Sequence, residues 1–175
     1  MNEIMKKILI IAVIFISVLG SSFWFKQNNF NNIVSKDKRN KGVDIYIYNQ
    51  FLLNPNVLII DIQGIPSTNS QMDVIRVLMQ YAQGIKGNSY SKVILSYKGT
   101  QKFFMNGDYF KNLGKEYGIQ NPMYTVRTMP ENLYKPEGKK AFSTWTGGAL
   151  GVLSKQMQDL KSMSEQWYLD DLVSN

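Results

Sequence analysis

The residues most able to do chemistry are polar side chains near the carboxyl ends of predicted strands. Two of these strands, 57–62 and 92–97, are expected to run parallel, and ligand sites in open α/β sheets form at the carboxyl ends of such strands. This rim of the sheet combines a carboxylate, a hydroxyl, an amine, a guanidinium and an amide. The groups belong to Asp61, Ser96, Lys98, Arg127 and Gln63.

The rim residues allow two interpretations, one catalytic and one structural. Lys98 could act as the base that activates Ser96, as in Ser-Lys hydrolases, and Gln63 is a candidate ligand-binding residue beside them. Residues two positions apart share one face of a strand, but this spacing does not make them hydrogen-bond partners. The structural alternative pairs Asp61 with Lys98 or Arg127, which would neutralise a carboxylate among apolar strands. We favour the structural interpretation.

The composition removes several kinds of active site. The 175-residue chain contains neither Cys nor His. Thiolate zinc sites, Cys nucleophiles, disulfides and Ser-His-Asp triads are therefore excluded. The glycines at 147–151 precede a helix but lack the Lys and Ser or Thr that complete a phosphate-binding loop. We predict neither a cofactor nor a metal site.

The first 25 residues resemble an export signal. Lys6 and Lys7 precede an apolar run over 8–19, which has the length of the apolar region in a secretory signal. Gly20 is a small residue that could precede cleavage ahead of Ser21. In this interpretation the mature protein is periplasmic or secreted.

The same segment is equally compatible with a retained membrane anchor. Counted on to residue 25, the apolar stretch that begins at Ile8 has 18 residues, close to the length that spans a bilayer. Its last three side chains would then form an aromatic belt at the far headgroup layer. These are Phe23, Trp24 and Phe25. The protein would be a single-pass membrane protein with its domain outside the cytoplasm.

Residues 26–42 are expected to form a polar, basic linker. The segment is rich in Asn and Lys and shows no apolar periodicity. Its basic cluster could contact anionic lipid headgroups, although a solvated tether is the simpler interpretation. The cluster contributes much of the net charge of +7. The remaining chain is only mildly basic, so we predict no nucleic-acid partner.

Residues 43–175 are expected to form a single globular domain of the α/β or α+β class. Its centre would be a single mixed sheet of about four or five strands with one βαβ crossover, and a short helix and a long C-terminal helix would pack on it. Residues 54–56 are expected to form a turn. The expected strands are 43–48, 57–62, 92–97, 101–105 and 123–129, and the expected helices are 70–83, 108–117 and 148–172.

The C-terminal helix carries an apolar stripe that is too long to remain exposed in a monomer. We expect the stripe to pack across the sheet, and the interruption at Ser164 disfavours a coiled coil. Its members are Leu150, Leu153, Met157, Leu160 and Trp167.

Together these features predict an exported or membrane-anchored protein of a bacterial cell envelope. The absence of a complete catalytic motif favours a binding module, whose partner would be an envelope protein, a lipid or a glycan. The alternative is an envelope hydrolase or transferase that acts through the rim of the sheet.

Overall fold

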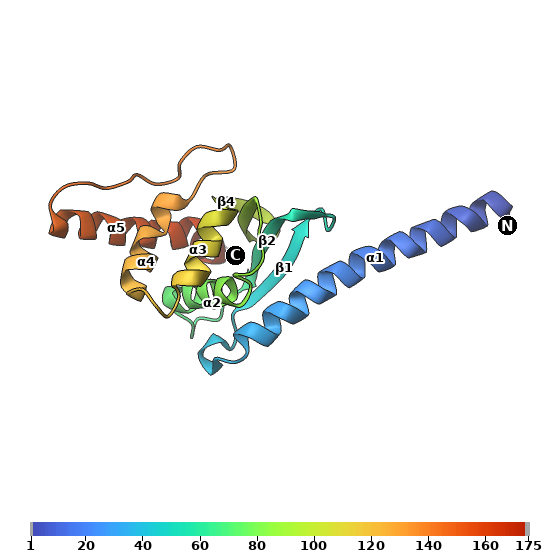
Figure 1. The fold of residues 1–175 in the computed structure, drawn as a ribbon, viewed down its shortest axis with the longest axis horizontal. Helices are drawn as coiled ribbons and strands as arrows, with labels where there is room; N and C mark the ends of the chain where they lie inside the picture. Colours follow the sequence, from blue (N-terminus) through green and yellow to red (C-terminus); the bar gives the residue numbers. More distant parts are fainter. Residues whose placement is uncertain (1, 174–175) are drawn as a thin grey trace.

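The computed structural model describes residues 2–173 and centres on a four-stranded sheet (Figure 1). The strands lie side by side in the order β1-β2-β3-β4. β2 and β3 are parallel, and both outer pairs are antiparallel. The bounds are β1 (Asp44–Gln50), β2 (Asn54–Gly64), β3 (Lys92–Tyr97) and β4 (Thr100–Asn106). The expected mixed sheet with one βαβ unit is confirmed.

The crossover helix α2 (Gln71–Gly84) joins the two parallel strands and begins where its sequence predicts. The carboxylate of Asp73 accepts hydrogen bonds from the backbone N–H of Ser70 at 2.6 Å and from its hydroxyl at 2.9 Å. This capping arrangement satisfies donors that the first turn of a helix leaves free. The buried side of α2 includes Val74, Leu78 and Tyr81.

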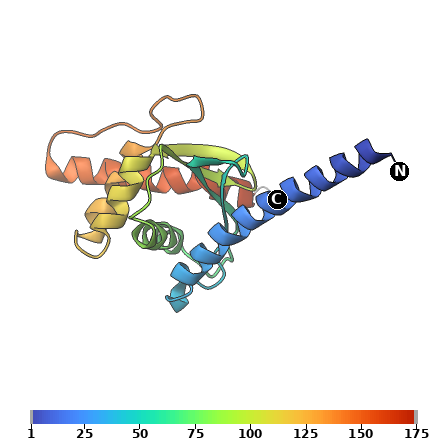
Figure 2. The same cartoon turned by 45° about the vertical axis from the view of Figure 1, so that its right-hand side comes forward.

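The two faces of the sheet differ in what covers them. One face packs against α2, α3 (Gly107–Glu116) and the C-terminal helical segment in the main apolar core. On the opposite face, Val57, Ile94 and Phe104 form only a small second cluster with Ile59 and Tyr134. Figure 2 shows the same arrangement from a second direction. We call this second side the open face of the sheet.

The first helix continues through the segment expected to be a linker. α1 extends from Glu3 to Val34, and a short 3-10 helix, η1 (Lys38–Asn40), follows it. Phe30 is only 3% exposed, and its ring lies 5.2 Å from that of Tyr81. The expectation of a solvated tether over 26–42 is therefore wrong. Phe30 and Ile33 form a narrow apolar stripe at helical spacing, which the surrounding Asn residues conceal in the sequence.

The chain reversal between β1 and β2 lies earlier than expected. The Asn-Pro-Asn sequence at 54–56 belongs to β2, and the turn occupies residues 51–53. Phe51 and Leu52 adopt φ values of +54° and +59°, a left-handed conformation that is uncommon for bulky residues. The turn lacks the Gly or Asn that usually marks such a reversal in a sequence, so it could not be located from Phe51 and Leu52.

The segment predicted as a fifth strand is a helix, α4 (Pro122–Thr128). The Asn121 side chain caps its first turn by accepting from the Met123 N–H at 3.0 Å, and Pro122 occupies the first helical position. These start signals outweigh the β-branched residues of a seven-residue segment. A short 3-10 helix, η2 (Pro130–Asn132), follows α4.

The C-terminal segment is confirmed as helical but packs over only part of its length. It comprises α5 (Ala149–Ser164), a π-helical turn (Glu165–Leu169) and α6 (Asp170–Val173). Leu160 and Trp167 are buried, whereas Leu150 is 84% exposed, Leu153 38% and Met157 39%. The first turns of α5 project beyond the sheet (Figure 1). The expected continuous packing of this stripe on the sheet is therefore wrong for its N-terminal half.

We predict that Leu160→Ala destabilises the domain by about 2–5 kcal/mol, because the buried side chain leaves a cavity. Leu153→Ala makes the same chemical change in the same helix at a half-exposed position and should cost about 1 kcal/mol or less. Denaturant unfolding of the full chain in detergent, followed by near-ultraviolet circular dichroism, measures both. Equal losses for the two variants would contradict the packing described.

Candidate functional site

The predicted rim begins with Asp61, which is 3% exposed and held by neutral donors. Its two carboxylate oxygens accept from the Gly99 N–H at 3.0 and 3.1 Å, and one also accepts from the Tyr48 hydroxyl at 3.1 Å. Burial, with the charge of Asp61 beside it, raises the pKa of Tyr48 to about 12. The phenol therefore stays protonated as a donor at neutral pH. Among the described residues Asp61 forms no ion pair with Lys98 or Arg127.

Ser96 lies beside Asp61, because the two are paired across β2 and β3. Ser96 is also 3% exposed. Its backbone carbonyl accepts from the indole N–H of Trp167 at 3.0 Å, which attaches the C-terminal segment to the sheet. Gln63 donates to the backbone carbonyl of Asp61 at 3.4 Å. The side chains of Asp61 and Gln63 thus hold neighbouring backbone, and the backbone of Ser96 holds the Trp167 side chain.

Lys98 and Arg127 do not join them. Lys98 is exposed in the tight β3–β4 turn, where it and Gly99 adopt positive φ, and its amine lies 5.3 Å from the ring centre of Tyr97. Arg127 belongs to α4 rather than to a strand, and its guanidinium lies over the ring of Tyr124. The structure brings Asp61 and Ser96 together and leaves both cations outside hydrogen-bonding reach of the carboxylate. Asp61 thus holds the β3–β4 turn through Gly99.

The surface hollows lie elsewhere. One of about 470 Å³ lies between the end of α1 and η1, and another of about 370 Å³ lies between α2 and α4. Rim residues line neither of these two hollows. Nor do three acidic side chains gather anywhere in residues 2–173 as a metal site would require.

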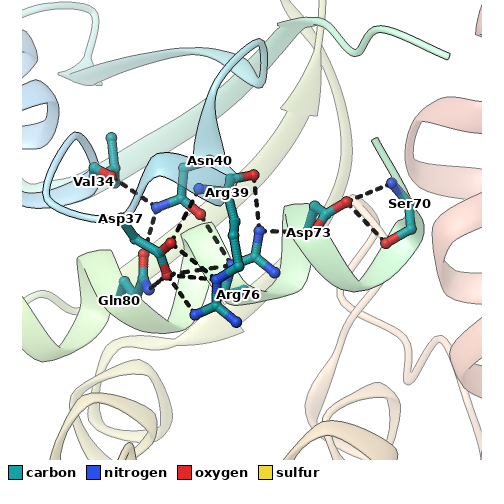
Figure 3. Close-up of polar contacts among 8 residues, drawn as sticks. All are labelled: Val34, Asp37, Arg39, Asn40, Ser70, Asp73, Arg76 and Gln80. Carbon is teal, nitrogen blue, oxygen red and sulfur yellow. Dashed lines mark hydrogen bonds and ion pairs between the residues drawn. The ribbon is translucent and has the colours of Figure 1, made fainter. Parts of the chain in front are cut away.

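The densest polar cluster joins the end of α1 to α2 (Figure 3). Arg39 binds the carboxylate of Asp37 in bidentate fashion, at 2.9 Å through Nε and 2.6 Å through Nη2. Gln80 donates to the same carboxylate at 2.9 Å. Arg76 pairs with Asp73 at 2.7 Å and donates from Nη2 to the Arg39 carbonyl at 3.0 Å. We call this set the joint cluster.

Sequence reasoning missed the joint cluster. Arg76 and Gln80 lie on the side of α2 away from the sheet, where both contact the segment after α1. The buried Asn40 adds a further connection, because its amide donates to the Val34 carbonyl at 2.8 Å and to the Gln80 side chain. A helix whose outer face carries Arg and Gln rather than Lys and Glu was the only signal available in the sequence.

The predicted belt residues lie where α1 meets the domain. Phe23 is half-buried, and its ring lies 5.9 Å from that of Tyr46 and 6.4 Å from that of Tyr48. Trp24 and Phe25 point away from the domain, at 59% and 67% exposure. One of the three therefore docks on the sheet, and the other two remain free for another environment.

No protein family model matches this chain, and neither a curated protein nor a solved structure shows significant similarity to it.

Hydrogen bonds from Arg39 and Gln80 hold the pKa of the Asp37 carboxyl well below its usual range, and the Ser70 N–H lowers the pKa of Asp73. A carboxyl whose pKa is lower in the folded chain stabilises it fully above the unfolded pKa of about 4, and this contribution is lost as the pH falls further. We predict that stability declines below about pH 4, and that Asp37→Asn makes the decline shallower.

Denaturant unfolding at a series of pH values measures this effect. The matched control is Asp44→Asn, which removes an exposed carboxylate at the start of β1. A decline in the Asp37→Asn variant as steep as in the parent chain would contradict the assignment of the low pKa to the joint cluster.

Proposed function

We propose that this chain is a single-pass, membrane-anchored protein of the cell envelope. Its domain is held by α1 at the membrane surface outside the cytoplasm, and it binds another envelope component there. The observation that carries the proposal is the continuity of α1. One helix contains both the apolar stretch and the residues that dock on the domain.

The apolar part of α1 has the dimensions of a membrane span. Its 18 residues over 8–25 measure about 27 Å at 1.5 Å per residue, close to the hydrocarbon thickness of about 30 Å. The most apolar 18-residue window of the helix has a mean hydropathy of 2.5, and none of it is buried against the domain. Side chains such as Ile11 and Ile16 are 66% and 67% exposed. An apolar surface of this size requires a non-aqueous partner, and a bilayer supplies one.

The docking of α1 supports retention of the anchor rather than cleavage. The bond between Gly20 and Ser21 lies inside the helix, and Phe23 contacts the sheet two residues beyond it. Gln27 is also tied to the domain, through hydrogen bonds to the backbone of β1. A cut at this point would fall within a continuous helix that is held by the domain.

The pattern of a basic pair followed by an apolar stretch supports an orientation with the N-terminus inside. Lys6 and Lys7 flank the apolar stretch on that side, although basic residues also follow it. The positive-inside count alone therefore does not choose an orientation. A basic pair directly ahead of an apolar run resembles an export signal, and this favours a domain outside the cytoplasm.

A binding role is supported by the surface of the domain that lies away from the N-terminus of α1 (Figure 1). Ile119 and Leu150 are each 84% exposed, and Tyr124 is 54% exposed. Exposed apolar side chains of this kind are suited to contact with a partner protein. The rim of the sheet offers no comparable surface, because Asp61 and Ser96 are buried.

We predict that the full-length chain of 20.1 kDa stays in the membrane fraction after an alkaline carbonate wash and keeps its N-terminus. Protease added to spheroplasts should digest the domain, since it lies outside the cytoplasm. Mass spectrometry and N-terminal sequencing of the recovered protein provide the measurement. A soluble chain that begins near Ser21 would contradict the retained anchor, and a domain that is protected in intact spheroplasts would contradict the orientation.

A further inference from the structure

The path of α1 past the domain shows which side of the sheet faces the membrane. Phe30 lies among the helices, with its ring against Tyr81 of α2. Gln27, one turn earlier, lies at the backbone edge of β1. Phe23, a further turn earlier, contacts Tyr46 and Tyr48 on the open face. Toward its N-terminus α1 therefore passes from the helical layer to the open face, so the apolar stretch leaves the domain on that side.

The β1–β2 hairpin extends in the same direction. The contacts of Gln27 and Phe23 show that α1, followed toward its N-terminus, runs in the same direction as β1 followed toward its C-terminal end. Phe51 lies four residues beyond Ile47, and four residues of extended strand span about 13 Å. A helix spans the same distance in about nine residues. Nine residues before Gln27 is Val18, so the hairpin tip reaches the level of the middle of the apolar stretch of α1. Figures 1 and 2 both show the tip extending toward the N-terminal half of α1.

The chemistry of the tip suits a lipid interface. Phe51 is 79% exposed and Leu53 is 54% exposed, and Leu52 lies between them. No charged residue occurs between positions 49 and 56, so insertion of the tip would desolvate no charge. The left-handed conformation of Phe51 and Leu52 presents these side chains in a tight turn. An exposed apolar tip of this kind marks an interaction surface rather than a core.

We infer that the hairpin tip is a second membrane contact, in which Phe51 and Leu53 insert among the lipids of the bilayer that α1 spans. The occupant is the lipid surface because α1 and the open face bring the tip to that surface. The inference rests on the proposed function, since it requires α1 to be retained in the membrane. With α1 and the hairpin both engaged, the domain is held at two points and its orientation over the membrane is fixed.

The absence of Cys allows a direct test, because each introduced Cys is the sole labelling site. The full chain is reconstituted into vesicles of phosphatidylcholine and phosphatidylglycerol as Phe51→Cys, Val13→Cys or Ile119→Cys, each labelled with the same environment-sensitive fluorophore. Val13 reports the anchor, and Ile119, which is 84% exposed, reports the membrane-distal surface. Quenching by nitroxide-bearing lipids is compared with quenching by aqueous iodide, and Leu53→Cys serves as a second tip position.

We expect lipid quenching to dominate at positions 13, 51 and 53, and iodide quenching to dominate at position 119. If position 13 is quenched by lipid while both tip positions behave like position 119, the tip contact is overturned and the anchor stands. If position 13 itself is open to iodide, the anchor fails, and the tip contact fails with it. Because Phe51 and Leu53 are exposed, their replacement removes no core packing.

Discussion

The side-chain amide of Gln27 makes the contact on which the arrangement of helix and domain depends. Its Nε2 donates to the Ile45 carbonyl at 3.0 Å, and its Oε1 accepts from the Ile47 N–H at 2.9 Å. The amide thus takes the place of a neighbouring strand at the free edge of β1, where unpaired backbone groups would otherwise invite pairing with another chain. Phe23 and Phe30 lie one turn to either side, so the same helix is fixed to the open face and to the helical core.

This attachment makes the connection between α1 and the domain rigid. The joint cluster ties the chain after α1 to α2 through Asp37, Arg76 and Gln80. In the proposed membrane-anchored arrangement, a tethered domain would sample many orientations over the membrane, whereas a domain continuous with α1 would present one face to the lipid and one to the exterior. Asp61 has a similar structural part within the domain, because its carboxylate holds the β3–β4 turn through Gly99.

Much of the sheet could be predicted because strand signals are local. Alternation over 43–48 and the apolar runs that became β2 and β3 depend on neighbouring residues alone. The joint could not be predicted, since the side chains of Gln27 and Arg76 acquire their roles only from partners distant in the sequence. The prediction that Arg127 joins the rim was wrong for a related reason, because it depended on a strand over 123–129 that is a helix. The stripe on α5 showed that one helix face was apolar but not where the sheet beneath it ends.

Hydrogen–deuterium exchange of the full chain in lipid nanodiscs tests the rigid joint most directly. In the proposed arrangement the amides of residues 26–34 lie in the aqueous part of α1, and helical hydrogen bonds held by tertiary packing exchange slowly. The account predicts that this segment is protected to a degree similar to the buried strand β3, and that Gln27→Ala accelerates exchange both there and at the edge of β1. Exchange over 26–34 as fast as in an unstructured chain would contradict the rigid joint, because a flexible segment would then connect the domain to α1.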